Sequence, residues 1–345
     1  MKRAAVHTLR RATEWLQKRF SSRGLILMYH RVADVDSDPW SLCVTSQHFA
    51  EHLEVLRKHG VPVQVQQLNQ ALQDGKRLLK SIAITFDDGY ADNFHNAKPL
   101  LERYDIPATV FVVSGHVGQE REFWWDELEQ LFLQPGTLPK TLQLSINGSP
   151  YQWELDEAVN YSEDTYQRYR RWHADQQDDP SPRHSLYRLL YKLLQPLLEG
   201  ERHKVLQELL AWSGAAPVSR PTHRSLSVTE LLTLGQGKLI EVGSHTVTHP
   251  LLSSLPLVLQ QDEVRLSKAR LEEIVDLPVC SFAYPYGNYT AATVDIVRDA
   301  GFFCACSAIE DTVQRYSDSF QLPRFEVQNW NGEEFEKRLL KWLHV

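Results

Sequence analysis

Two adjacent carboxylates are the first candidates for chemistry in this sequence. Asp87 and Asp88 directly follow the apolar run 81–86, and Gly89 follows them. Glycine permits a sharp change of chain direction at the end of a strand. An Asp in such a place can also cap a turn or point into solvent, so this motif alone leaves a structural role open.

Two histidines four residues apart form a second candidate. His245 and His249 lie in Ser-His-Thr-Val-Thr-His, and Pro250 follows. The chain has 14 His, so the spacing by itself is weak. Proline disfavours helical geometry at the residue before it. The pair therefore differs from the helical zinc-protease motif, which also has Glu where this chain has Thr246.

One of the two aspartates and the two histidines together offer three ligands suited to Zn²⁺ or a similar ion. Such a set leaves one position for water, and a bound metal lowers the pKa of that water towards about 7. The other aspartate is then free to act as a general base. The residues therefore predict metal-assisted hydrolysis.

The elements that must position these residues read as alternating strands and helices. Apolar, strand-like runs cover 25–29, 81–86, 108–113, 239–242, 281–284 and 302–307, and helical patterns lie between several of them. Near-continuous apolar strands separated by helices predict a parallel sheet covered by helices, as an α/β barrel or a strongly twisted sheet. Polar clusters at 29–31, 87–89, 244–245 and 284–287 follow four of these runs. Strand ends of a parallel sheet meet on one face, so these clusters are expected to converge.

Residues 119–225 break this rhythm. We expect a mostly helical insertion in one loop of a barrel that spans 25–345, because helical patterns occupy 186–212. Trp124 and Trp125 open the insertion. Their rings could line a sugar cleft, or they could pack in a core.

Residues 1–24 show a basic, amphipathic helical pattern. Residues 1–31 carry eight Lys or Arg and one acid, Glu14. Such a helix can lie on an anionic membrane surface or dock on its own domain. We find no signal-peptide or spanning pattern and expect a cytoplasmic protein, with peripheral contact to the inner membrane face as an option. The net charge of −7 gives no reason to expect nucleic-acid binding.

Three motifs resemble a known family. Thr-Phe-Asp-Asp-Gly at 85–89, Ser-His-Thr-Val-Thr-His at 244–249 and Tyr-Pro-Tyr-Gly at 284–287 resemble the first three motifs of the NodB-homology polysaccharide deacetylases, carbohydrate esterase family 4. The resemblance covers about 25–120 and 226–330. It implies an incomplete (β/α) barrel that removes N-acetyl groups from N-acetylglucosamine-type units of a polysaccharide or oligosaccharide.

The resemblance also implies roles for single residues. Asp87 would be the catalytic base, and the metal ligands would be Asp88, His245 and His249. Zn²⁺ is the expected ion, with Co²⁺, Mn²⁺ or Ni²⁺ as alternatives. The backbone amide of Tyr286, after Pro285, would help to stabilise the oxyanion.

The chain departs from the family pattern at two places. Ala283 stands where the third motif commonly has Arg, and we expect Arg324 to take that role unless it is an ordinary surface Arg or one paired with a carboxylate. The C-terminal Leu…His motif is not evident, and His344 lies in an expected terminal helix. His30, in Leu-Met-Tyr-His-Arg, resembles the histidine of poly-N-acetylglucosamine deacetylases whose motif precedes the Asp-Asp motif. It would then protonate the departing amine.

Two other functions remain open at this stage. The same metal site could deacylate a lipid-linked sugar or another amide, or the chain could be a carbohydrate-binding relative that has lost catalysis. A glycosidase is disfavoured, because adjacent Asp87 and Asp88 cannot flank a glycosidic bond from opposite sides. The sequence does not fix the oligomeric state.

Overall fold

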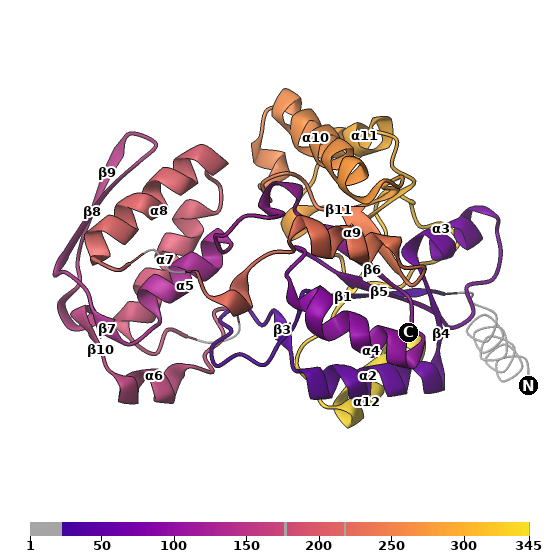
Figure 1. Cartoon of the computed structure of the whole chain (residues 1–345), viewed down its shortest axis with the longest axis horizontal. Coiled ribbons are helices and arrows are strands. Elements are labelled where there is room, and N and C mark those ends of the chain that lie inside the picture. Colours follow the sequence, from indigo (N-terminus) through magenta and orange to yellow (C-terminus); the bar gives the residue numbers. More distant parts are fainter. Residues whose placement is uncertain (1–22, 176–177, 217–218, 345) are drawn as a thin grey trace, which may run out of the picture.

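The computed structural model describes residues 23–175, 178–216 and 219–344. Most of the predicted N-terminal helix, residues 1–24, lies outside them. Figure 1 shows two regions, a sheet with its helices and a second group of helices and strands beside it. The second group lies between 119 and 225 and is called the insertion below. In the described part of the chain, no helix combines the length and apolar character needed to cross a membrane.

A parallel sheet forms the centre of the larger region, as the sequence predicts. Its strand order is β13-β12-β11-β6-β5-β1-β14, and β4 pairs with the first half of β5. The strands are β1 (Leu25–Tyr29), β4 (Val61–Val63), β5 (Ser81–Phe86), β6 (Ala108–Val112), β11 (Ile240–Ser244), β12 (Ser281–Ala283), β13 (Cys304–Cys306) and β14 (Phe325–Glu326). Two further strands, β2 (Arg31–Val32) and β3 (Cys43–Val44), form a separate parallel pair.

Both faces of the sheet are buried. In β1, Leu25 and Leu27 belong to the large core that includes residues of the surrounding helices, whereas Ile26 belongs to a smaller core with Ala83 and Phe111. All five residues of β1 are buried. A strand with two buried faces has no polar side to show, which explains its continuous apolar run.

The segment 322–326 brings the two edges of the curled sheet together. Leu322 pairs with Cys306 of β13, and Phe325 pairs with Leu27 of β1. The amide of Arg324, between them, donates to the carbonyl of Ile309 at 3.0 Å. The curled sheet confirms the predicted incomplete barrel, and the curl gathers the strand ends at one rim.

Helices cover the outside of the curled sheet. In Figure 1, α2, α4 and α12 lie below the strands, and α10 and α11 lie above them. Their bounds, with α3, are α2 (Ser46–His59), α3 (Val65–Gln73), α4 (Lys98–Tyr104), α9 (Val228–Gln236), α10 (Leu257–Val275), α11 (Ala291–Asp299) and α12 (Gly332–His344). Ser227 and Thr290 cap α9 and α11 with their hydroxyls, which fixes where these helices begin.

The insertion has its own buried core and contains strands as well as helices. Its elements are α5 (Trp124–Phe132), β7 (Gly136–Thr137), β8 (Thr141–Ile146), β9 (Ser149–Glu154), β10 (Asn160–Tyr161), α6 (Glu163–Tyr169), α7 (Pro182–Leu194) and α8 (Glu199–Ser213). The β8–β9 hairpin turns at Asn147 and Gly148, both with positive φ. Asn-Gly between alternating apolar residues is a strong hairpin signal, which our reading of the sequence missed.

Gly243 of β11 provides a test of the packing inside the sheet. A Cβ at this position would overlap the Phe111 ring, so Gly243→Ala should lower the free energy of unfolding by about 1–3 kcal/mol. Gly200→Ala is the matched control, because its added Cβ meets nothing within 4 Å and it lies in α8. It should leave stability unchanged or raise it by up to about 1 kcal/mol. Urea denaturation of both variants checks this, and equal stability would contradict the packing.

Candidate active site

Side chains next to three strands of the sheet meet in one pocket at its rim. Asp87 and Asp88 follow β5, His245 follows β11, and Arg324 precedes β14. The pocket has a volume of about 260 Å³. Its lining residues are Met28, His30, Trp40, Leu42, Asp87, Asp88, Trp125, Asp175, Tyr191, His245, His249, Tyr284, Tyr286, Gly287, Ala308, Arg324 and Glu326. The convergence predicted from the strand ends is therefore present for these residues.

Asp88, His245 and His249 form a compact set of possible metal ligands. One ligand atom from each lies within 4.8 Å of the other two. Asp88 Oδ1 is 3.4 Å from His249 Nε2 and 3.7 Å from His245 Nε2. Asp87 lies beside this set, with its Oδ2 4.0 Å from His245 Nε2. An oxygen and two imidazole nitrogens suit a borderline ion such as Zn²⁺.

A backbone contact orients His245. Its Nδ1 lies 2.8 Å from the carbonyl oxygen of Ala283. A carbonyl only accepts, so Nδ1 carries the hydrogen and Nε2 keeps its lone pair towards Asp88. This is the arrangement in which a metal-binding imidazole is held by its second nitrogen.

The loop 246–249 is held in an unusual backbone conformation. Thr246 and His249 have φ of 67° and 56°, in the left-handed region that side chains other than glycine rarely adopt. Glu263 of α10 accepts from the amides of Val247 and Thr248 at 2.8 and 2.9 Å. These bonds to a carboxylate offset the cost of the strained backbone.

The surroundings of Asp88 call for a cation. Asp88 is 3% exposed, and its ion-pair partners in the described chain are His245 and His249. Burial lowers the pKa of both histidines, so they are neutral near pH 7. Burial and the neighbouring Asp87 raise the pKa of Asp88 well above its usual value. A buried carboxylate without a countercharge is unfavourable, so a divalent cation fits these residues.

Arg324 forms a two-pronged ion pair with Asp87. Its Nη1 and Nη2 donate to the two carboxylate oxygens at 2.7 and 2.8 Å, and Nε donates to the carbonyl of Ser307 at 2.8 Å. Burial opposes the ionisation of Asp87, but Arg324 and His245 outweigh it and lower its pKa to about 2. Asp87 is therefore ionised near neutral pH.

His30 lies at the same pocket, partly exposed. Burial lowers its pKa to about 4, despite the opposing effect of Asp87. Its imidazole is therefore neutral near pH 7.

Pro285 and Tyr286 form the turn beside the ligand set. Pro285 is buried and begins the turn Pro285–Gly287, in which Tyr286 has φ of 56°. The Tyr286 ring meets His249 edge-on, with ring centroids 4.5 Å apart. Pro285 is not among the pocket-lining residues, so its place is to shape the turn that presents Tyr286.

Trp124 and Trp125, which open the insertion, lie in different surroundings. Trp125 lines the pocket, and its ring lies 5.1 Å from that of His249. Trp124 is buried behind it against Tyr191, at 4.7 Å, and does not line the pocket. Sequence reasoning did not identify Tyr191 or Trp40. Trp40 lies eleven residues after β1, and neither Trp40 nor Tyr191 carried a local signal in the sequence.

Comparisons with known proteins find similarity to polysaccharide deacetylases. A family model described as polysaccharide deacetylase matches residues 74–137 and 228–305. A putative polysaccharide deacetylase, YxkH of Bacillus subtilis, is 29% identical over 119 residues, which are 34% of this chain and 41% of that protein. A poly-β-1,6-N-acetyl-D-glucosamine N-deacetylase of Staphylococcus aureus is 33% identical over 78 residues, which are 22% of this chain and 27% of that protein. Each match covers less than half of the relative's length.

Solved structures share the fold over nearly the whole chain. IcaB from Ammonifex degensii matches with a TM-score of 0.58 and 19% identity, covering 94% of this chain and 98% of that one. The deacetylase PplD of Streptococcus pyogenes, in complex with acetate, matches with 0.57 and 16%, covering 94% and 99%.

The Asp87–Arg324 pair predicts a dependence of stability on both partners and on pH. Arg324→Met leaves a buried carboxylate unpaired and should lower the free energy of unfolding by roughly 3–5 kcal/mol at pH 7. The folded pKa of Asp87, about 2, lies below its ordinary value of 3.8. The pair's contribution to the free energy of unfolding is therefore fully present above pH 3.8 and is lost as the pH falls towards 2. The difference in free energy of unfolding between wild type and Arg324→Met should become smaller over this range.

Urea denaturation at pH 7 and at stepwise lower pH measures this gap. The double variant Asp87→Asn, Arg324→Met should lose less stability than Arg324→Met alone, because no unpaired charge remains. If the double variant loses as much stability as the two single variants, Asp87→Asn and Arg324→Met, lose together, the two residues are not coupled.

Proposed function

We propose that this chain is a metal-dependent hydrolase that removes N-acetyl groups from N-acetylglucosamine-type units of a polysaccharide or oligosaccharide. The match of residues 74–137 and 228–305 to a polysaccharide deacetylase model supports this proposal. One observation carries the proposal. Asp88, His245 and His249 lie close enough to share one ion, directly beside the ionised Asp87. The products would be acetate and a free amino sugar.

Zn²⁺ is the ion we propose for this site, held by Asp88, His245 and His249. Co²⁺, Mn²⁺ and Ni²⁺ are alternatives of similar ligand preference. When bound, such an ion polarises a carbonyl and lowers the pKa of water.

The chain's own residues would divide the proton transfers and charge stabilisation. Asp87 is ionised before the reaction, so it can accept a proton from the attacking water. Arg324 fixes the direction of both its oxygens. The Tyr286 amide would donate to the oxyanion as the carbonyl becomes tetrahedral.

His30 would protonate the amine as the carbon–nitrogen bond breaks. An amine is a poor leaving group unless it is protonated, so an acid is required at this step. The imidazole is neutral before the reaction, because burial lowers its pKa to about 4. The proton must therefore reach it within the site, and the proton taken up by Asp87 is the available source.

The size of the pocket favours a single sugar unit as the part of the substrate that binds in it. Its volume of about 260 Å³ lies below the roughly 300–1,000 Å³ of sites for drug-sized ligands. Trp40, Trp125 and Tyr191 supply aromatic surface for a sugar face. The Staphylococcus aureus relatives are named for an N-acetylglucosamine polymer, which supports this sugar.

Acetate release from N-acetylglucosamine oligomers of increasing length tests the substrate. Release that does not depend on length, together with release from a lipid-linked sugar, would favour the alternative deacylase. Glycan binding without acetate release in added Zn²⁺, Co²⁺ or Mn²⁺ would favour an inactive binding protein.

Replacing the ligands and the base should have separable effects. Asp88→Ala and His245→Ala should lose both bound metal and acetate release, because each removes a ligand. Asp87→Asn should keep the metal and lower kcat by roughly 10²–10⁴-fold, because it removes a proton acceptor. Metal content after dialysis and acetate release from N-acetylglucosamine oligomers measure the two effects. Retained activity in Asp88→Ala would refute the assignment.

The role of His30 can be tested with two leaving groups. His30→Gln should lower kcat on an N-acetyl amide by roughly 10²–10⁴-fold. It should affect an activated acetyl ester such as 4-nitrophenyl acetate far less, because a phenolate leaves without protonation. Parallel assays of wild type and variant give the comparison. An equal loss on both substrates would show that His30 does not act as the acid.

A further inference from the structure

We propose that the insertion is part of the metal site, and that Arg202 of α8 and Trp125 of α5 are positioning residues for His249. This inference rests on the proposed function, since it takes His249 as a metal ligand. It adds that two residues outside the ligand set, from a different part of the fold, determine how tightly the ion is held.

His249 lacks the support that His245 has. The Nδ1 of His245 bonds to the Ala283 carbonyl, whereas the Nδ1 of His249 is buried and has no hydrogen-bond partner in the described chain. The His249 backbone also has φ of 56°. Its ring direction must therefore come from ring packing and from the peptide that precedes it.

Trp125 provides one wall for the His249 ring. The two rings meet at 60° with centroids 5.1 Å apart, and Tyr286 packs from another side at 4.5 Å. The indole is itself fixed, because its Nε1 donates to the Tyr90 hydroxyl at 2.7 Å. That hydroxyl donates in turn to Asp126 at 2.7 Å. Tyr90 lies two residues after Asp88, so Trp125 is bonded to the loop that carries Asp88 and packs on the ring of His249.

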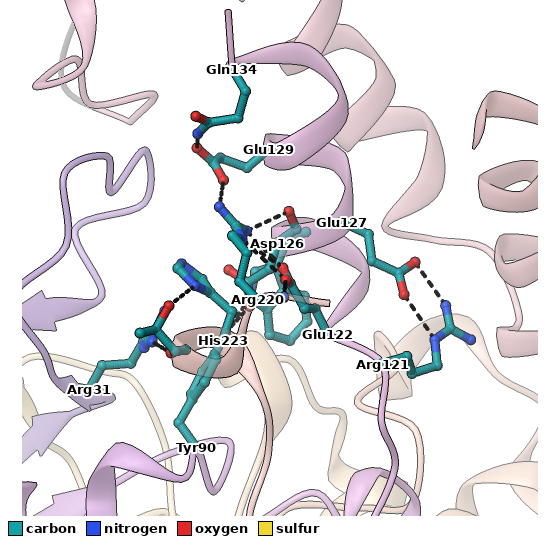
Figure 2. Close-up of polar contacts among 12 residues, drawn as sticks. Arg31, Tyr90, Arg121, Glu122, Asp126, Glu127, Glu129, Gln134, Arg220 and His223 are labelled. Carbon is teal, nitrogen blue, oxygen red and sulfur yellow. Dashed lines mark hydrogen bonds and ion pairs between the residues drawn. The ribbon is translucent and has the colours of Figure 1, made fainter. Parts of the chain in front are cut away.

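Ion pairs hold the helix that carries Trp125. Figure 2 shows Arg220 between Glu122 and Glu129; Glu122 lies two residues before α5, and Glu129 lies within it. The Arg220–Glu122 pair measures 2.7 Å, and Glu122 is 1% exposed. Arg31, from β2, lies over the Tyr90 ring at 4.3 Å. Trp125 and Asp126 of α5 both bond to Tyr90. A shift of α5 relative to the sheet would break these two bonds, so Trp125 cannot move away from His249 freely.

Arg202 fixes the peptide that leads into His249. Its side chain is 1% exposed, and Nη2 donates to the Thr248 carbonyl at 3.1 Å and to Glu199 at 2.6 Å. Glu263 holds the amide of the same residue, Thr248, from the other side. The residue is therefore clamped at its amide by the barrel and at its carbonyl by the insertion. Bonds with a charged partner are roughly twice as strong as neutral ones, so the clamp is well suited to a strained loop.

Metal affinity is the property that should respond. Outer contacts that orient ligands typically change metal affinity by roughly 10–100-fold when they are removed. Arg202→Met should therefore weaken Zn²⁺ binding by about tenfold in the full-length protein. Competition with a chromophoric chelator measures the Kd without any need for enzyme activity.

Arg183 provides the matched control. It is a buried arginine of the same insertion, 2% exposed, and its guanidinium donates to the carbonyls of Ala158 and Val159 within the insertion. Arg183→Met removes the same group from the same core but touches no residue of the ligand loops. It should leave the Zn²⁺ Kd unchanged, whatever it does to the melting temperature.

The outcomes separate this inference from the proposed function. An unchanged Kd in Arg202→Met, or an equal loss in Arg183→Met, would overturn the positioning role. If Arg202→Met does not fold, Trp125→Phe decides in its place, because it keeps a ring beside His249 and loses the bond to Tyr90. An unchanged Kd in that variant would also overturn it. Wild-type protein that binds no Zn²⁺ would instead refute the proposed function itself.

Discussion

The site depends on how two carboxylates, adjacent in sequence and buried together, are stabilised. Asp87 and Asp88 are each 3% exposed, so neither can rely on water to stabilise its charge. The protein supplies a fixed cation to one of them, Arg324, and only neutral imidazoles to the other. The carboxylate with the built-in partner stays ionised, and the other requires a mobile cation. The proposed base, Asp87, and the proposed metal ligand, Asp88, thus differ in their surroundings.

Several residues of the site have a strained backbone conformation that the surrounding structure must hold in place. Asp88, Thr246, His249 and Tyr286 all have positive φ, although none is glycine. Each such residue costs of order 1–3 kcal/mol and persists only where the surroundings hold it. Glu263 and Arg202 hold the loop of the two histidines from opposite sides. The ligand geometry is therefore maintained by rigid elements around the loops, and the loops alone would not keep it.

The sequence predicted the parallel sheet and the convergence of Asp87, Asp88, His245 and His249, because strand periodicity and strand-end position are local signals. It also pointed to Arg324, but only through the absence of Arg at 283. The roles of Arg202 and Tyr191 could not be found, because a helix of the insertion carries no local mark of the surface that it will face. Trp124 and Trp125 were also not distinguished from the sequence. They are neighbours in the first turn of α5, yet Trp125 lines the pocket and Trp124 packs against Tyr191 behind it. The β8–β9 hairpin was different, because its Asn-Gly signal was present in the sequence.

The closing segment of the barrel has a consequence for the order of synthesis. Arg324 and Asp87 are 237 positions apart, so the aspartate leaves the ribosome long before its partner. All three proposed ligands also emerge before residue 324. A nascent chain at that stage has the proposed metal ligands, yet Asp87 lacks its counterion and an edge of the sheet stays open. Unpaired strand edges are prone to aggregation, and the segment 322–326 both pairs the open edge and brings Arg324 to Asp87.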